Sequence, residues 1–224
     1  MSAAATLMRQ PWLWAWVGAL FVWLVTAGFT GGRGSAEVLT AALTFGAFFV
    51  IVALGQMFVI TLGPGNVDLS IPAGMTLAGT VAMKTIDGSA AMIPVGIALA
   101  LAIGVGVGVI NYALIRLLRI PPIIATLSSS FIFQSAAIWW NRGLRVKPPE
   151  ALADFTTAKI TGIPVIALFV ILLAAAGHIL LTRTIFGRSV VAIGQNMRAA
   201  HLAGINVERT RAVTYIMCAT LAGL

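Results

Sequence analysis

The chain has 224 residues, of which 60% are hydrophobic and only 9% are charged. A soluble domain needs a polar surface in contact with water, so this composition excludes one and predicts an integral membrane protein. The formal net charge is +8, but the basic residues lie between long apolar runs. Membrane orientation and contact with anionic lipid headgroups explain such placement better than binding to nucleic acid does.

Six apolar stretches before residue 182 approach the ~20 residues that a helix needs to cross a bilayer. The predicted spans cover residues 11–29, 38–62, 70–86, 90–118, 121–140 and 162–181. We therefore expect an all-α, polytopic transmembrane helix bundle, with residues 1–224 forming a single domain and the amino terminus inside. A cleaved signal peptide is the alternative for the first span, but its tryptophans and the lack of a small-x-small cleavage site favour a retained helix.

A helix-breaking cluster, GPGN at residues 63–66, separates the second span from the third. The third span is short, so we expect a broken or short helix near residues 63–83. Irregular backbone at membrane depth is tolerated only where protein or a water-filled cavity covers it, and such breaks point to transport pathways. Asp68 follows the cluster and is either a functional carboxylate or a structural one, since Asp68 or Ser70 could cap the next helix by accepting from its free amides. We favour the cap, because no cation partner is evident.

Polar side chains in the spans and in the break are candidates for lining a translocation pathway. They are Gln56, Asn66, Asp68, Ser70, Asn111, Ser128 and Gln134. The alternative for any one of them is a hydrogen bond between neighbouring helices. Gly104 and Gly108 are four residues apart, a spacing that lets helix backbones approach closely. The lone Cys218 excludes an internal disulfide and a multi-cysteine metal site, and we expect it in the core.

The interval 182–211 is the one long polar stretch, with five arginines against one acid. Asn196 is a candidate N-cap for a short helix over residues 197–203, and Gly204 suits the position just past its end. One interpretation is a basic loop that only sets orientation. The other is a short docking helix along the membrane surface.

The sequence FGRSVVAIGQNMRAAHLAGI, residues 186–205, resembles the cytoplasmic coupling loop of inner-membrane permeases of ribose-type ABC sugar importers. The matching positions are Phe186, Gly187, Arg188, Ala192, Ile193, Gly194, Asn196, Ala199, Ala200, Gly204 and Ile205. Residues 55–70 and 121–127 resemble two further signatures of that family. The chain departs from the family where residues 64–66 precede the Asp-Leu-Ser, and at Ser128, where the family has glycine.

The resemblance implies that the interval 182–211 is a cytoplasmic coupling loop that receives the conformational stroke of a separate ATP-binding cassette ATPase. The residues assigned to this role are Gly194, Asn196, Arg198, Ala199, Ala200, Gly204 and Ile205. ATP and Mg²⁺ are expected on that partner, with no cofactor or metal on this chain. The other implied partners are a periplasmic substrate-binding protein at the outer loop 141–161, a second permease copy (identical or related) and membrane lipid.

The expected function is that of an ABC-importer permease subunit, which passes a pentose or hexose across the bacterial inner membrane. The chain is expected to be a transporter subunit and not an enzyme, because it carries no catalytic motif and no phosphate-binding loop. The alternative is an ion- or proton-coupled secondary transporter of a small polar solute, for which Asp68 alone is a thin supply of ionisable groups. A seventh span, 212–224, supplies only thirteen residues, so we expect a carboxy-terminally truncated form of the family pattern.

Overall fold

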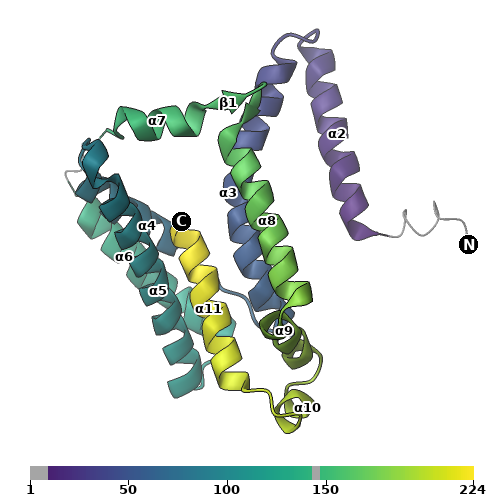
Figure 1. The fold of residues 1–224 in the computed structure, drawn as a ribbon, viewed down its shortest axis with the longest axis vertical. Helices are drawn as coiled ribbons and strands as arrows, with labels where there is room; N and C mark the ends of the chain where they lie inside the picture. The colour runs from purple at the N-terminus through teal and green to yellow at the C-terminus, as the bar shows by residue number, and fades with distance from the viewer. Residues whose placement is uncertain (1–9, 143–146) are drawn as a thin grey trace, which may run out of the picture.

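The computed structural model describes residues 10–142 and 147–224, and it confirms the predicted all-α polytopic bundle (Figure 1). The long helices are α2 (Pro11–Phe29), α3 (Ser35–Thr61), α4 (Ile71–Ile86), α5 (Ile93–Leu117), α6 (Pro122–Asn141), α8 (Val165–Arg183) and α11 (Val207–Gly223). The short elements are η1 (Ala90–Met92), α7 (Glu150–Thr157), α9 (Ile185–Gln195) and α10 (Met197–Leu202), with strands β1 (Lys159–Ile160) and β2 (Ile163–Pro164). Residues 1–9, which we expect on the inner side of the membrane, lie outside the described residues, and so does Arg145 of the predicted outer loop.

Five helical segments of the described chain are long and apolar enough to cross a membrane. They are α2, α3, α6, α8 and the stretch Ala90–Leu117, which contains α5. Helix α4 has 16 residues, a length of about 24 Å at the usual helical rise, against a hydrocarbon core of roughly 30 Å. The short helix after the break is therefore present as predicted.

The connecting segments lie at two opposite ends of the bundle (Figure 1). Helix α7, the two strands and the turn between α2 and α3 are at one end, and α9, α10 and the first turn of α11 are at the other. The helices thus alternate in direction along the chain, as consecutive membrane crossings require.

Three predicted loops contain more helix than expected. Helix α3 begins at Ser35, inside the predicted loop 30–37 and directly after Gly34, which is left-handed (φ 73°). Glu37 lies in the first turn of α3, where a negative charge stabilises the helix. Helix α11 begins at Val207, five residues before the apolar run at 212, because the Asn206 side chain caps it.

The predicted outer loop 141–161 contains both α7 and β1, and β1 pairs antiparallel with β2.

The interval 182–211 is not an open loop, because α9 fills its first half. Thr184 caps this helix by accepting a hydrogen bond from the Gly187 amide at 3.1 Å. Phe186, Val190 and Ile193 recur at helical spacing, and the last two are buried. The polar character of the interval concealed this apolar stripe, so the sequence analysis missed the helix.

The predicted close approach at Gly104 and Gly108 is confirmed, and its partner is α11. A Cβ atom on Gly104 would lie 2.7 Å from the Ala219 carbonyl oxygen, and one on Gly108 would lie 2.5 Å from the Cα of Ile216. On its other side, α11 packs against α3, where Cys218 is buried as predicted. Helix α11 is therefore the central element that joins α3 to α5.

Candidate functional site

Helices α9 and α10 form a compact unit at one end of the bundle, which we call the arm (residues 185–206). Asn196 ends α9 and begins α10, and its Oδ1 accepts a hydrogen bond from the Ala199 amide at 3.0 Å. Helix α10 ends at Leu202, and Gly204 follows in the left-handed conformation, with φ 84°. The Ile205 amide then donates to the Ala200 carbonyl at 3.1 Å. The predicted cap, short helix and terminal glycine are confirmed.

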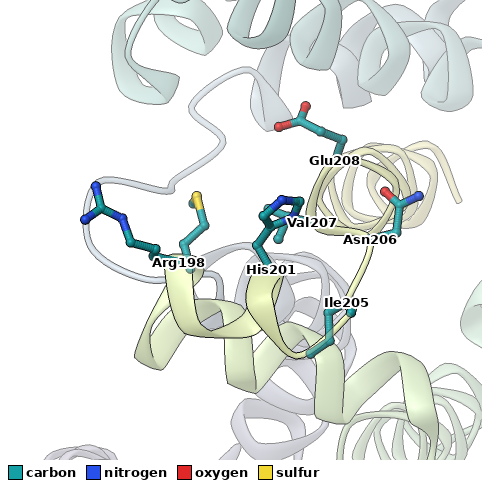
Figure 2. A pocket seen from close by; sticks show the side chains of 8 residues that line it. Arg198, His201, Ile205, Asn206, Val207 and Glu208 are labelled. Atoms are coloured by element: carbon teal, nitrogen blue, oxygen red, sulfur yellow. The ribbon is translucent and has the colours of Figure 1, made fainter.

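An open pocket of about 720 Å³ lies between α10 and the start of α11 (Figure 2). Its lining residues are Met197, Arg198, His201, Gly204, Ile205, Asn206, Val207 and Glu208. Figure 2 shows Arg198 at the left of the view, apart from His201 and Glu208. The volume is in the range of protein pockets that bind small molecules. Beside it, Leu202 projects from α10 with 82% of its surface exposed.

The residues predicted to take part in coupling divide between this surface and the protein interior. Asn196, Arg198, Ala199 and Gly204 are exposed, and Ile205 is half-buried in the lining. Two others point inward. Ala200 is buried in the largest core cluster, and Gly194 packs against the end of α3. The five lining residues that the sequence did not predict are Met197, His201, Asn206, Val207 and Glu208. The predicted start of the last helix was too late in the chain to bring these residues together.

Glu208 connects the pocket to α5. Its carboxylate forms an ion pair with the Arg116 guanidinium and accepts a hydrogen bond from Tyr112 Oη at 2.7 Å. The same hydroxyl is 2.8 Å from the Glu208 backbone carbonyl. Both ion-pair partners are about half exposed, so the pair itself contributes only ~0–1 kcal/mol. Its importance is geometric, because it ties the start of α11 to the end of α5.

A second cluster lies inside the bundle around Asp68, which is 1% exposed. Asp68 Oδ1 accepts hydrogen bonds from the Ser70 amide (2.9 Å) and the Ser70 hydroxyl (2.6 Å). Asn111 Nδ2 on α5 lies 3.3 Å from each Asp68 carboxylate oxygen and donates to Ser70 Oγ at 2.7 Å. Ser129 on α6 donates to Asn111 Oδ1 at 2.5 Å. Asp68 therefore joins the helix break directly to α5 and, through Asn111, to α6. The favoured capping role is wrong, because Ser70 is the N-cap of α4 without a side-chain cap hydrogen bond and Asp68 accepts from the Ser70 amide, which precedes the helix.

Side chains of three helices, α3, α6 and α11, hold the helix break between α3 and α4 (residues 62–70, the break segment). Gln56 on α3 pairs with the Asp68 backbone, donating to its carbonyl at 2.6 Å and accepting from its amide at 3.3 Å. Thr126 on α6 accepts from the Leu69 amide at 3.0 Å. Tyr215 on α11 donates to Asn66 Oδ1 at 3.2 Å. Side chains thus satisfy backbone groups that the break releases, as irregular backbone at membrane depth requires.

Five of the seven predicted pathway residues meet in this network, and two do not. The five are Gln56, Asn66, Asp68, Ser70 and Asn111, whereas Ser128 and Gln134 are exposed on another face of α6. The network also includes Thr126, Ser129 and Tyr215, which were not among the seven. The spacing of three between Thr126 and Ser129 places them on one helix face and was the available signal; nothing in the sequence marked Tyr215. That the seven residues line a pathway stays a prediction.

Comparisons with known proteins place these features in context. The family model described as "Branched-chain amino acid transport system / permease component" matches residues 38–224. The autoinducer 2 import system permease protein LsrC of Enterobacter sp. (strain 638) is 28% identical over 218 residues, which are 97% of this chain and 63% of that protein. The protein of the same name from Shigella flexneri is 28% identical over 191 residues, covering 85% of this chain and 55% of its own length.

A probable ABC transporter permease protein, y4mJ of Sinorhizobium fredii, is 30% identical over 183 residues, covering 79% of this chain and 53% of its own length. The chain therefore spans between half and two thirds of the length of these relatives. No solved structure matches it.

Proposed function

This chain belongs to the family of branched-chain amino acid transport system permease components, and from that premise we propose that it acts as a membrane-spanning permease subunit of an ABC importer. The structural observation that carries the proposal is the arm. A capped six-residue helix stands at one end of the bundle beside an open pocket, in the segment that resembles the coupling loop of sugar permeases.

In the proposed mechanism, a separate ATPase subunit docks on α10 and on the pocket beside it. ATP and Mg²⁺ bind that partner, and its closure displaces the arm. The displacement switches the bundle between inward-open and outward-open arrangements. A symmetric pair of ATPases requires a second permease copy, identical or related.

The opposite end of the bundle suits a periplasmic substrate-binding protein. Helix α7 and the β1–β2 pair cover it, with Glu150, Asp154 and Lys159 exposed. With this end outside, the arm and the amino terminus lie in the cytoplasm and the bundle lies in the bacterial inner membrane.

The proposed cargo is a monosaccharide of the pentose or hexose class, because the three matched signatures resemble those of sugar permeases. Two of the relatives described above are named for import of autoinducer 2, so autoinducer 2 belongs in the same test panel. Uptake of labelled pentoses, hexoses and autoinducer 2 by the full-length importer discriminates among them.

Capture of the ATPase subunit encoded beside the full-length protein tests the docking assignment. Leu202→Glu places a charge on the exposed tip of α10, and Ile160→Glu makes the same change on an exposed side chain at the other end of the bundle. We expect Leu202→Glu to reduce capture at least tenfold and Ile160→Glu to leave it unchanged. No capture by the unmodified protein would sink the proposal.

A further inference from the structure

The end of α9 packs directly on the end of α3 through backbone atoms. A Cβ atom placed on Gly194 would overlap the carbonyl oxygen of Thr61 and lie 3.3 Å from the Gly63 amide nitrogen. Conversely, a Cβ on Gly63 would lie 3.1 Å from the Gly194 carbonyl oxygen. Only glycine at position 194 permits this approach. The arm therefore contacts the beginning of the break segment with no flexible side chain between them.

Buried side chains surround this backbone contact. Val190 and Ile193 of α9 belong to the same core cluster as Val59 near the end of α3 and Leu62 at the start of the break segment, and each is at most 2% exposed. Close-packed interiors have low compressibility and transmit strain. A displacement of α9 must therefore move the end of α3 or separate the two helices.

The break segment is tied on its other side to helices that form the bundle. Asn66 bonds Tyr215 on α11, Asp68 bonds Asn111 on α5, and the Leu69 amide bonds Thr126 on α6. The segment thus lies between the arm and three long helices. Because Asn196 ends α9 and begins α10, no linker separates the outer surface of α10 from the contact at Gly194.

We propose that Gly194 is a positioning residue that transmits movement of the arm to the break segment, so that a push on α10 shifts residues 62–70 and with them the start of α4. The inference rests on the proposed function, because the push comes from the docked ATPase. It assigns Gly194 to transmission inside the bundle and not to the docking surface.

The test compares Gly194→Ala with Gly46→Ala in the full-length protein reconstituted with its ATPase. Gly46 is the matched control, because it lies in α3 and a Cβ there meets no atom within 4 Å. A nitroxide attached at Leu69→Cys, a 39% exposed position, reports on the break segment in a background without other reactive cysteines. Native Cys218 is 1% exposed and is protected from the label.

We expect the unmodified protein and Gly46→Ala to capture the ATPase and to change the nitroxide spectrum when ATP is trapped with vanadate. Gly194→Ala should capture the ATPase equally well but lose the spectral change and at least tenfold of the ATP-driven uptake. A spectral change and uptake at normal levels in Gly194→Ala would overturn the proposal.

Val190→Ala is the second variant, because it shortens a side chain in the contact without adding an atom. Val190→Ala should still capture the ATPase, while both the nitroxide spectral change and the uptake fall. Normal values of both would contradict transmission from the arm to the break segment, even if Gly194→Ala fails to fold. Loss of ATPase capture by the unmodified protein would instead refute the docking assignment itself.

Discussion

The packing of α11 on α5 makes opposite predictions for two glycines in the same helix. Gly106 and Gly108 both lie in α5, two residues apart. A Cβ on Gly106 meets nothing within 4 Å, whereas one on Gly108 would lie 2.5 Å from the Ile216 Cα and 2.9 Å from the Tyr215 carbonyl oxygen. Replacement of each by alanine is therefore a matched pair.

The magnitudes follow from the contact distances. Carbon atoms pack at about 3.5–4.0 Å, so Gly108→Ala must move α11 away by roughly 1 Å. Gly104 and Gly223 make equally close contacts along the same interface, and separation loosens all of them. Such overpacking costs typically ~1–3 kcal/mol. Gly106→Ala adds no clash and should stabilise the helix by roughly 0.5–1 kcal/mol.

The assay is thermal unfolding in detergent, and the reaction of Cys218 with a thiol-reactive fluorophore monitors the transition. Cys218 is the one cysteine of the chain and is buried on α11, so its reaction reports separation of this helix. Gly108→Ala should lower the transition temperature and Gly106→Ala should leave it unchanged or raise it. Equal shifts in the two variants would refute the described packing of α11.

Three further substitutions test the site. Asn111→Leu removes the amide that donates hydrogen bonds to Asp68 and Ser70 and leaves buried polar atoms unpaired. It should therefore destabilise the chain by about 1–3 kcal/mol or more. The control Ser128→Ala, on the exposed face of α6, should leave the transition temperature unchanged. Asn196→Ala should cost about 1 kcal/mol of helix stability and speed amide exchange in α10, while Asn196→Asp retains the cap; unchanged exchange in Asn196→Ala would contradict the capping role. Glu208→Gln should lower the free energy of unfolding by less than ~1 kcal/mol, because the ion pair with Arg116 is exposed. A larger loss in a denaturant titration would contradict this and show that the ion pair contributes more to the packing of α11 on α5.

Local signals in the sequence predicted local structure well. Apolar runs located the long helices, and the GPGN cluster located the break before α4. The pattern around Asn196 and Gly204 predicted the short helix, because capping depends on residues within one turn. The spacing of Gly104 and Gly108 predicted a close helix contact for the same reason.

Features that depend on tertiary packing were not predictable. Gly104 and Gly108 pack on α11 residues that lie about one hundred positions later in the chain. No periodicity in the sequence encodes such a pairing. Tyr215 reaches the break segment only because α11 passes between α3 and α5. Helix α9 was missed because its apolar stripe, of which Val190 and Ile193 are buried, lies in an interval rich in polar residues. The composition of the interval indicated a loop, whereas its periodicity indicated a helix.

A photo-crosslinker at Leu202 tests the central claim most directly, because that side chain projects from the tip of α10. The full-length protein would carry it in membranes that also contain the ATPase encoded beside it, with an identical crosslinker at Ile160 as the control. The account predicts a covalent adduct with the ATPase from position 202 and none from position 160. No adduct from position 202, with the ATPase present and folded, would contradict the assignment of the arm as its docking site.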